Sequence, residues 1–393
     1  MQENTVTEHC RMPDLPPPNA ALRLSAVIPV RNEAGGIART LAALALQNDG
    51  LGNALDPACY EVLVLANNCT DETAEAARCF GRRHPQLPLH VIEAVLPPAI
   101  AHVGTARRCL MDLAALRLLA VGQPHGVVAS TDGDTRVASD WVHSLLREIQ
   151  SGADAVGGRI RVERKRGEDR DARLYCLRDA AYQRGLVRLE SLLDPDPADP
   201  WPRHHQFFGG NLGVTADAYC RVGGLPPLPC LEDVAFEEAL RRADARIRRS
   251  PHIRVSTSAR QDGRTPLGLS SQLREWGEMG RTGHVHWVQQ LAAAATRFES
   301  RRRLRRCWAD KRTKPNEIEK LAAALAVPAC VLATGLADFS RPFGTLWADV
   351  MDYHKDPNGD WAQRWPLIPI TDALADLRRQ SFESAIRSKT SSR

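Results

Sequence analysis

Short apolar runs alternate with segments of helical spacing over the first 150 residues of the chain. Residues 24–30, 60–66, 89–93 and 127–130 are apolar runs short enough to be strands, and the segments between them carry apolar residues at the spacing of a helix. Strands that alternate with helices are typical of a parallel sheet that has helices on both faces. The sequence therefore predicts an α/β fold for this part of the chain.

The composition is that of a globular protein with no nucleic-acid partner. Of the 393 residues, 43% are hydrophobic and 25% are charged, and the net charge of +5 is too small to indicate a nucleic-acid binder. The ten cysteines lack the Cys-x-x-Cys spacing of a zinc site, and residues 1–20 lack the apolar core of a signal peptide. We therefore expect a cytoplasmic protein whose thiols are free.

The C-terminal part, residues 277–393, is predicted to be a mostly helical extension. Its longest apolar stretch, residues 321–337, contains Pro328 and is shorter than the roughly 20 residues that span a bilayer, which favours a pair of buried helices. Arginines crowd residues 297–306. Such a run is usually a solvated face, and it could also make a peripheral contact with acidic lipid headgroups or with another protein.

Two carboxylates flank one glycine in Asp132-Gly133-Asp134, directly after the apolar run at 127–130. In an open α/β sheet, ligands bind beyond the carboxyl ends of the strands. Two carboxylates placed there repel each other, and a divalent cation that also binds substrate phosphates relieves the repulsion. The tripeptide alone favours a simple surface turn, so the neighbouring motifs decide the interpretation.

Four further motifs accompany this turn. They are Val27-Ile28-Pro29-Val30-Arg31-Asn32-Glu33, Asn67-Asn68-Cys69-Thr70-Asp71, Gly104-Thr105-Ala106-Arg107, and Gly209-Gly210-Asn211 followed by Glu232-Asp233. The first ends a predicted strand and opens a helix, whose N-terminus is a favourable place for phosphate. In the second, Thr70 and Asp71 are expected to cap the next helix.

In this order, the five motifs resemble those of the nucleotide-sugar glycosyltransferases of the GT-A fold, in particular the large family 2. The resemblance covers about residues 24–276. It implies a Rossmann-like, mostly parallel sheet with helices on both faces, in a catalytic domain at 23–276 that follows a disordered leader at 1–22. The nucleotide half would be about 23–135 and the acceptor half about 136–276.

The resemblance also implies a set of site residues. Asp134, with Asp132, would hold Mn²⁺ or Mg²⁺ on the diphosphate of a nucleotide-sugar donor, and Asp233 would be the catalytic base that deprotonates a hydroxyl acceptor, with inversion. The donor would be bound by Pro29, Asn32, Glu33, Asn67, Arg107, Asp132, Gly210, Asn211, Arg260 and Arg264.

One position departs from the family pattern. The family has acidic residues before the Asn-x-Ser-Thr-Asp run, one of which contacts the base, where this chain has Ala66 and Asn67. An amide both donates and accepts hydrogen bonds, whereas a carboxylate only accepts them. The sequence therefore does not assign the base to uracil or guanine.

Two alternatives remain at this stage. A sugar nucleotidyltransferase would share the nucleotide-binding half, but the turn at residues 31–36 lacks the glycine-rich basic signature of that class. A degenerate, non-catalytic sugar-nucleotide-binding protein is supported only by the missing acid at Ala66 and Asn67.

Residues 194–205, which are rich in proline, are predicted to be a mobile loop that closes over the acceptor.

Overall fold

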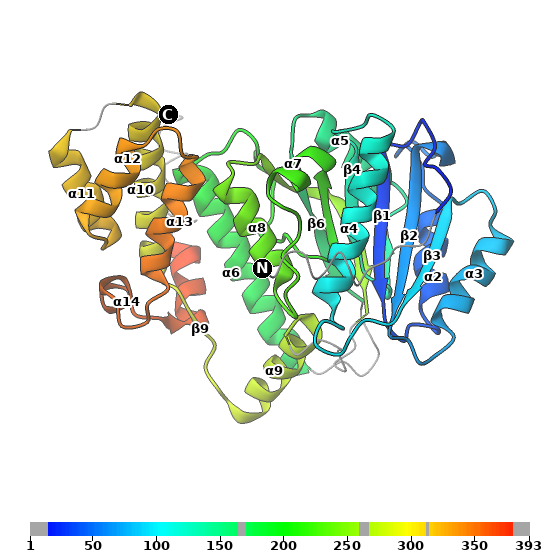
Figure 1. The fold of residues 1–393 in the computed structure, drawn as a ribbon. Helices are drawn as coiled ribbons and strands as arrows, with labels where there is room; N and C mark the ends of the chain where they lie inside the picture. The colour runs from blue at the N-terminus through cyan, green and yellow to red at the C-terminus, as the bar shows by residue number, and fades with distance from the viewer. Residues whose placement is uncertain (1–14, 164–169, 259–266, 312–313, 380–393) are drawn as a thin grey trace, which may run out of the picture. The chain divides into compact units, whose positions relative to one another are not determined.

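A computed structural model describes residues 15–163, 170–258, 267–311 and 314–379. The chain divides into two compact units (Figure 1). Unit 1 comprises residues 1–165, 206–240 and 245–271, and unit 2 comprises residues 166–205, 241–244 and 272–393. Residues 166–205 therefore group with the C-terminal helices, whereas the sequence analysis placed them in the acceptor half of a domain that ends at 276.

Unit 1 is built on an eight-stranded sheet with the strand order β3-β2-β1-β4-β7-β6-β8-β5. Neighbours among β3, β2, β1 and β4 are parallel, as are β6 and β8, whereas β7 and β5 are antiparallel to the strands they pair with. The strands are β1 Leu24–Val30, β2 Tyr60–Asn67, β3 Leu89–Ala94, β4 Val127–Thr131, β5 Thr135–Val137, β6 Ala155–Val162, β7 Asn211–Thr215 and β8 Ile247–Thr257.

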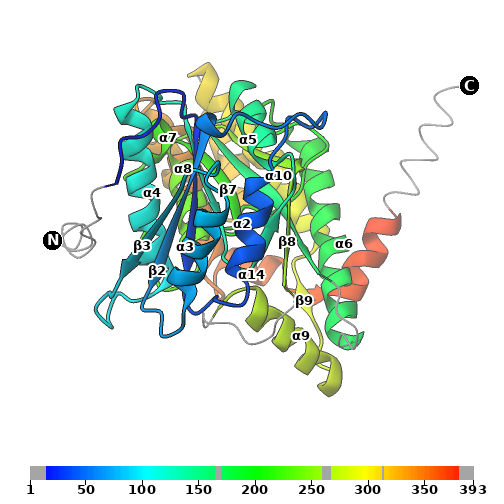
Figure 2. The same cartoon turned by 90° about the vertical axis from the view of Figure 1, so that its right-hand side faces the viewer.

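Helices cover both faces of this sheet. On one face, buried side chains of the strands pack against α2, α3 and α5, and on the other they pack against α4, α7 and α8. Figure 2 views the molecule with α2 and α3 in front of the strands. The helices are α2 Ile37–Ala45, α3 Thr73–Arg83, α4 Val103–Ala120, α5 Trp141–Gln150, α7 Ala216–Arg221 and α8 Glu232–Arg242, with a short 3-10 turn at Pro57–Cys59.

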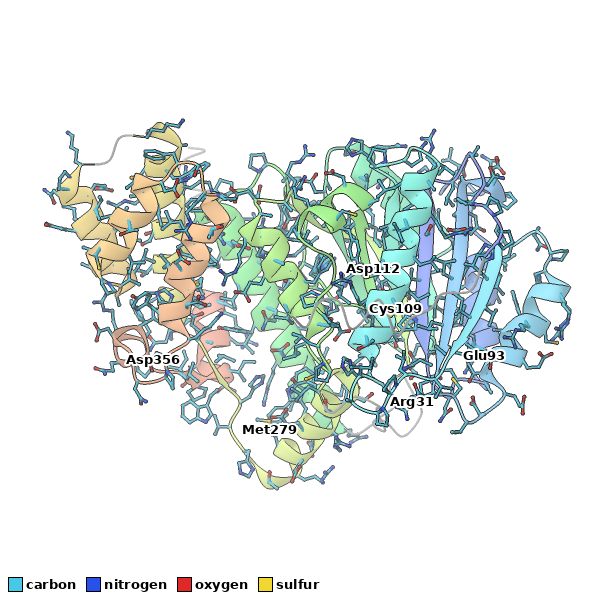
Figure 3. The ribbon with its side chains drawn as sticks, viewed as in Figure 1. Arg31, Glu93, Cys109, Asp112, Met279 and Asp356 are labelled. Atoms are coloured by element: carbon cyan, nitrogen blue, oxygen red, sulfur yellow. The ribbon has the colours of Figure 1, made fainter. Side chains whose placement is uncertain are left out.

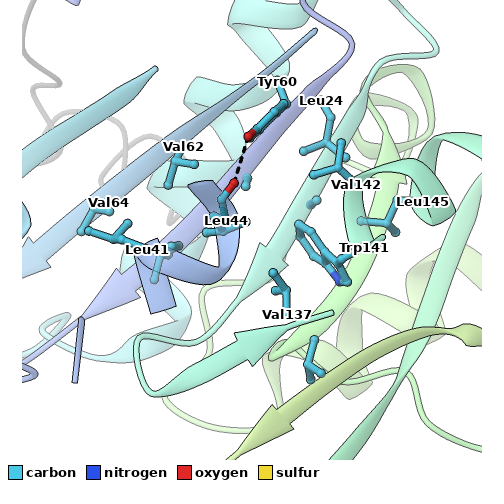
Figure 4. Close-up of a cluster of buried hydrophobic side chains, with 14 of the residues drawn as sticks. Leu24, Leu41, Leu44, Tyr60, Val62, Val64, Val137, Trp141, Val142 and Leu145 are labelled. Atoms are coloured by element: carbon cyan, nitrogen blue, oxygen red, sulfur yellow. Dashed lines mark hydrogen bonds between the residues drawn. The ribbon is translucent and has the colours of Figure 1, made fainter. Parts of the chain in front are cut away.

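The core beneath α2 and α5 shows why these segments form helices. Leu41 and Leu44 lie one turn apart on α2 and are fully buried against the strands, as is Trp141 on α5 (Figure 4). The Tyr60 hydroxyl donates to the Leu44 carbonyl oxygen at 2.9 Å, which satisfies a carbonyl at the end of α2. Apolar residues at helical spacing therefore supply the packed layer on this face.

The α/β prediction is confirmed, and most predicted strands and helices agree with the structure to within a few residues. The exceptions lie where the sheet becomes antiparallel. β8 runs over eleven residues, and β5 and α7 were not predicted. β5 has only three residues, too few to show a period of two.

Unit 2 is mostly helical, as predicted. Its elements are α6 Arg170–Leu193, α9 Leu269–Thr282, α10 Leu291–Asp310, α11 Pro315–Leu325, α12 Ala329–Ala337, α13 Phe343–His354 and α14 Asp360–Arg364, with the small strands β9 Trp287–Val288 and β10 Ile368–Pro369. Pro328 caps α12, so the apolar stretch at 321–337 is the expected helix pair. Within the described ranges, no helix is both long enough and apolar enough to cross a membrane.

A buried ion network fixes the loop at 194–205. The Asp194 side chain is fully buried, and its carboxylate accepts hydrogen bonds from Arg305 (2.7 Å) and Arg301 on α10. Arg203 bonds Asp199 within the loop and Glu190 on α6, and its own side chain is 2% exposed. The loop predicted to be mobile is therefore held at Asp194 and at Arg203 by ion pairs whose central groups, Asp194 and Arg203, are buried.

The same network changes the interpretation of the arginines at 297–306. Arg301 binds both Glu190 and Asp194, Arg302 donates to the Leu193 carbonyl oxygen, and Arg303 pairs with Glu317. Arg297 lies 5.2 Å from the ring centre of Trp361. Most of these arginines are thus used inside unit 2 instead of forming a solvated face.

Two smaller expectations also need correction. Residues 15–22 were assigned to a disordered leader, but Leu22 is buried in the core beneath α4 and the Pro16 carbonyl oxygen accepts a hydrogen bond from Arg117. Residues 1–14 lie outside the described part of the chain. Eight described cysteines are free, as expected, whereas Cys109 is disulfide-bonded.

Unit 1 holds a buried charge cluster that the sequence analysis did not predict. Glu61 on β2 is 3% exposed and accepts hydrogen bonds from Arg117 on α4 and from the Ser25 hydroxyl at 2.8 Å. Burial alone would raise the pKa of Glu61, but bonds from His90, Arg117 and Ser25 outweigh it and lower the pKa to about 2. Because this value is below that of an unfolded glutamate, the cluster stabilises the ionised, folded form.

We predict that Glu61→Gln destabilises the protein at neutral pH by on the order of 3 kcal/mol, the size that the lowered pKa implies. The stabilisation is complete above about pH 5 and is lost as the pH falls through the range between 4.5 and about 2. The free energy of unfolding, measured against pH for both proteins, should therefore converge at low pH. Glu75→Gln, which removes an exposed pair with Arg82, is the control and should show no difference. A gap that stays constant down to pH 3 would contradict the prediction.

For unit 2, we predict that Asp194→Asn lowers the free energy of unfolding by roughly 3 kcal/mol, because Arg301 and Arg305 lose their buried carboxylate. Chemical denaturation measures the loss. Asp196→Asn is the matched control, since Asp196 is exposed in the same loop and accepts only a local hydrogen bond from the Ala198 amide. Equal stability of the two variants would show that the network does not hold the loop.

Candidate active site

The carboxyl ends of β1, β2 and β3 lie level with one another at one edge of the sheet. Val30 pairs with Ala66, and Ala66 pairs with Glu93. Figure 3 labels Arg31 and Glu93 toward the lower ends of β1 and β3 in that view, where both strands finish. The turns that follow these strands, together with the turn after β4, form the edge at which an α/β sheet binds its ligands.

The turn after β1 is fastened to the turn after β2. Asn32 adopts a left-handed conformation (φ 55°), and its side-chain oxygen accepts a hydrogen bond from the Thr70 amide at 2.8 Å. The Glu33 amide donates to the Thr73 hydroxyl, and Asp71 accepts from the amides of Thr73 and Ala34. The residue that caps α3 is Glu72, whose side chain makes no capping bond, so the expected capping by Thr70 and Asp71 is wrong. Asp71 bonds the Thr73 amide from one position before the cap, and Thr70 contacts Asn32.

This fastening limits what Pro29 and Glu33 contribute to ligand binding. Pro29 is buried in β1. The ladder between β1 and β4 ends at the pair Val27 and Ser130, two residues before Pro29. The amide hydrogen that proline lacks is therefore missing at a position where β4 no longer pairs with β1. Glu33 is 8% exposed, and its Cγ lies 3.3 Å from the position a Cβ would take on Gly133. Both residues therefore shape the floor of the site beneath the Asp132-Gly133-Asp134 turn.

Asn67 differs from its neighbours because its side chain has no partner. It ends β2 and is 4% exposed, and no hydrogen bond of its amide group occurs among the described residues. By contrast, the Asn68 side chain bonds both the amide and the carbonyl of Leu96. Asn67 is thus a nearly buried amide at the ligand edge that retains its donors and its acceptor.

The predicted metal-binding carboxylates follow β4 directly. Asp132 Oδ1 accepts from Arg107 Nη2 at 3.0 Å, while Oδ2 lies against Gly210, where a Cβ would stand 2.5 Å away. Asp134 Oδ2 accepts from the Ser258 hydroxyl at 3.0 Å. Gly133 lets the turn pass Val30, since a Cβ there would approach the Val30 side chain to 2.5 Å.

Arg107, in the first turns of α4, joins the other parts of the site. Its guanidinium is 3% exposed and donates to Glu232 Oε1 (3.1 Å), to the Gly209 carbonyl oxygen (2.7 Å), to Asp132 and to the Ser130 hydroxyl. Burial alone would lower the pKa of Arg107, but the carboxylates around it, Asp132 foremost, raise the pKa above its ordinary value. Arg107 was expected to bind the donor; its bonds make it the group that positions both carboxylate motifs.

Glu232 and Asp233 open α8 and take different roles. Glu232 is 5% exposed and pairs with Arg107. Asp233 is partly exposed; its Oδ2 accepts from the Gly209 amide at 2.8 Å, and its Oδ1 from the Val234 amide. The two backbone bonds fix the orientation of the Asp233 carboxylate and tie it to the glycine turn.

The glycine turn explains two residue choices and corrects one prediction. A Cβ on Gly209 would lie 2.8 Å from Arg107 Cζ, so both Gly209 and Gly210 leave room for charged groups of the site. Asn211, in contrast, is fully buried: its oxygen accepts from Trp141 Nε1 at 2.8 Å, and its amide faces the carbonyl oxygens of Arg159 and Ile253. The side-chain oxygen and amide of Asn211 are both hydrogen-bonded within the protein. Asn211 therefore supports the sheet and leaves no group to bind the nucleotide sugar.

The oxygen atoms at Asp132 and Asp134 fit a hard divalent cation in part. Carboxylate oxygens are metal ligands, and the Ser258 hydroxyl lies beside the Asp134 carboxylate. No group of three metal-binding side chains occurs among the residues that the structure describes. Mg²⁺ is commonly held by one or two carboxylates together with substrate phosphates and water, which is compatible with this donor set. The predicted donor residues Arg260 and Arg264 lie outside the described residues.

The fold and the site together define a glycosyltransferase of the GT-A class. The family model described as Glycosyl transferase family 2 matches residues 25–199, which include β1 to β6 of the sheet. No curated protein matches the chain.

Solved structures of glycosyltransferases are similar at low sequence identity. The mannosyltransferase PcManGT from Pyrobaculum calidifontis, solved with GDP-Man and Mn²⁺, has 18% identity and a TM-score of 0.43 over 89% of this chain and 91% of that chain. S. aureus TarS 1–349, solved with UDP-GlcNAc, has 14% identity and a TM-score of 0.42 over 85% and 92%. Glucosyl-3-phosphoglycerate synthase from Mycobacterium tuberculosis has 18% identity and a TM-score of 0.36 over 69% and 86%.

Sequence reasoning missed two polar residues of the site and one pairing. The Ser130 hydroxyl donates to the Gly209 carbonyl oxygen at 2.7 Å, and Ser258 contacts Asp134. Glu232 was part of a predicted motif, but its pair with Arg107 was not expected. Ser130 is a polar residue in an otherwise apolar strand, which was an available signal. Nothing in the sequence pairs Glu232 with a residue 125 positions earlier.

We predict that Arg107→Met destabilises the protein by about 3–5 kcal/mol, because Glu232 would remain buried without its cation. Combining it with Glu232→Gln should cost less than the sum of the two single changes, since the double variant leaves no buried charge in that pair. Urea denaturation of the four proteins measures this coupling. Arg108→Met, on the next residue of α4 where the side chain is 27% exposed, is the control and should cost less. Additive effects of Arg107→Met and Glu232→Gln would contradict the positioning role.

Proposed function

We propose that this glycosyltransferase moves a sugar from a nucleoside-diphosphate donor to a hydroxyl group of an acceptor, with a divalent cation and with inversion at the anomeric carbon. One observation carries the proposal: the buried Arg107 bonds the Asp132 turn, the Gly209 carbonyl oxygen and Glu232, whose neighbour Asp233 bonds the same glycine turn. Asp132 is suited to holding a cation bound to a diphosphate, and Asp233 is suited to accepting a proton. These hydrogen bonds hold the two carboxylates in fixed positions relative to each other.

Asp132 and Asp134 are the residues that would hold Mn²⁺ or Mg²⁺. When bound, the ion would neutralise the charge that develops on the leaving diphosphate. Arg107 orients the Asp132 carboxylate for this role. It binds Oδ1, so that Oδ2, beside Gly210, is the oxygen left for the cation. Asp134 lies on the far side of Gly133, with its carboxylate oriented by Ser258.

The donor base is assigned to the Asn67 amide. Asn67 is at the carboxyl end of β2 and keeps its hydrogen-bonding groups without a protein partner among the described residues. An amide can both donate to and accept from the edge of a nucleobase. Asn67 thus takes the place that an acidic residue holds in the family pattern.

Asp233 is the proposed general base. The acceptor hydroxyl loses its proton to the Asp233 carboxylate as its oxygen bonds to the anomeric carbon, while the bond from that carbon to the diphosphate breaks and the nucleoside diphosphate leaves. The bonds from the amides of Gly209 and Val234 hold the carboxylate in one orientation, and each oxygen still has a lone pair for the proton. A single displacement of this kind inverts the anomeric configuration.

We predict that Asp134→Ala removes the Mn²⁺-dependent part of nucleoside-diphosphate binding. Calorimetry with uridine and guanosine diphosphates, each with and without Mn²⁺, measures it. Asp217→Asn, an exposed aspartate on α7, is the control and should bind as the wild type does. Metal-dependent affinity that survives in Asp134→Ala would exclude the carboxylate from the ion site.

We also predict that Asp233→Asn lowers turnover by roughly 10²–10⁴-fold while donor binding stays nearly unchanged, because asparagine keeps an oxygen for the Gly209 amide but cannot take the proton. Steady-state kinetics and donor titration measure the two effects, and the anomeric configuration of the product by NMR tests inversion. Turnover close to that of the wild type, or a product with retained configuration, would contradict the assignment.

A further inference from the structure

A row of arginines crosses β5, β8 and β6 next to the Asp132-Gly133-Asp134 turn. Ser256 on β8 pairs with Arg136 on β5 and with Arg161 on β6, so these three side chains lie side by side on one face. Arg254, two residues along β8, lies on the same face as Ser256. Together they line a cleft of about 360 Å³ whose remaining lining residues are Ala43, Val137, Ala138 and Val255.

The charges of this arginine row are not balanced within the described residues. Arg136 bonds Glu163, with its Nε 2.9 Å from Oε1, and Arg254 lies 3.4 Å from Asp140. Arg161 is exposed and makes no ion pair in the described part of the chain. Arg159 pairs with Arg254 across β6 and β8 and is also exposed on this face, so four guanidinium groups face two carboxylates. Like charges on neighbouring strands destabilise a sheet. A bound oxyanion would relieve this repulsion, because phosphate and carboxylate match the paired N–H groups of arginine.

The arginine row is close to the proposed transfer site. The Asp134–Ser258 contact adjoins the first pair of the β5–β8 ladder, Thr135 with Thr257, and the second pair is Arg136 with Ser256. At about 3.3 Å per residue, Arg136 lies about 7 Å along the strand from Asp134, and Arg254 lies about 13 Å from Ser258. One small molecule can span such a distance.

We propose that the arginine row binds an oxyanion group, phosphate or carboxylate, carried by the acceptor. This inference rests on the proposed function, and it names the substrate class: an acidic alcohol whose charged group is held by Arg136, Arg161 and Arg254. The donor diphosphate is assigned to the other side of Asp134, at Asp132 and the glycine turn, so the two anionic groups occupy separate places.

The first experiment measures binding of inorganic phosphate to the full chain by calorimetry without metal, in the wild type, Arg161→Gln and Arg254→Gln. Arg161 is exposed and unpaired, so its replacement should leave the fold intact, which a thermal unfolding curve checks. We expect both variants to bind phosphate at least about tenfold more weakly. Arg78→Gln, which removes an exposed arginine of α3, should bind as the wild type does. Absence of phosphate binding in the wild type, or equal binding by all variants, would overturn the proposal.

A second measurement separates the arginine row from the donor site. Phosphate binding should persist when the protein is saturated with nucleoside diphosphate and Mn²⁺, and displacement by the nucleotide would assign the anion to the donor site and overturn the proposal. With a donor and acceptor that support turnover, phosphate should inhibit competitively against the acceptor, and more weakly in Arg161→Gln. Competition against the donor would overturn the acceptor assignment. Failure of the proposed function would instead appear as a wild type that binds phosphate at the arginine row but no nucleotide.

Discussion

The hydrogen bonds and ion pairs of the Arg107 guanidinium hold together the candidate active site of unit 1. Four of its contacts reach Ser130 in β4, Asp132 just after β4, Gly209 before β7 and Glu232 at the start of α8. At 3% exposure, the arginine stays charged because the carboxylates around it outweigh the cost of burial. Such a cluster is stable only when complete, since removing one partner leaves a buried charge unpaired. The geometry of the carboxylates is therefore fixed before any ligand binds.

Buried charge is also used away from the site, and for a different purpose. Glu61 with Arg117 fastens β2 to α4 in unit 1, and Asp194 with Arg301 and Arg305 fastens a proline-rich loop to α10 in unit 2. In each case a carboxylate with less than a tenth of its side chain exposed is met by a planar guanidinium, which can offer several donors at once. Arg117, Arg301 and Arg305 thus serve internal geometry, whereas Arg136, Arg161 and Arg254 are exposed.

The sheet explains why the site assembles at this edge. β1, β2 and β3 run parallel and finish level with one another, so their turns meet, and the turns after β1 and β2 are joined through Asn32 and Thr70. β7 runs antiparallel to β4, with Thr131 paired to Asn211, which brings the glycine turn that precedes β7 beside the turn that follows β4. The change of strand direction therefore places residues 132–134 and 209–210 next to each other although they are distant in the sequence.

The sequence by itself determined the elements and the positions of the strand-end turns, because apolar periodicity and turn residues act over a few neighbouring positions. It placed Asp132, Asp134 and Asp233 at turns or helix starts, where the structure also has them, whereas Asn67 is the last residue of β2. Only the tertiary structure decided which of these groups face a ligand. Arg107 meets partners 102 and 125 residues away, and Asn211 is fully buried, with its amide bonded within the sheet. Burial and long-range pairing set the cost of leaving a polar group without a partner, and both arise when distant strands pack together.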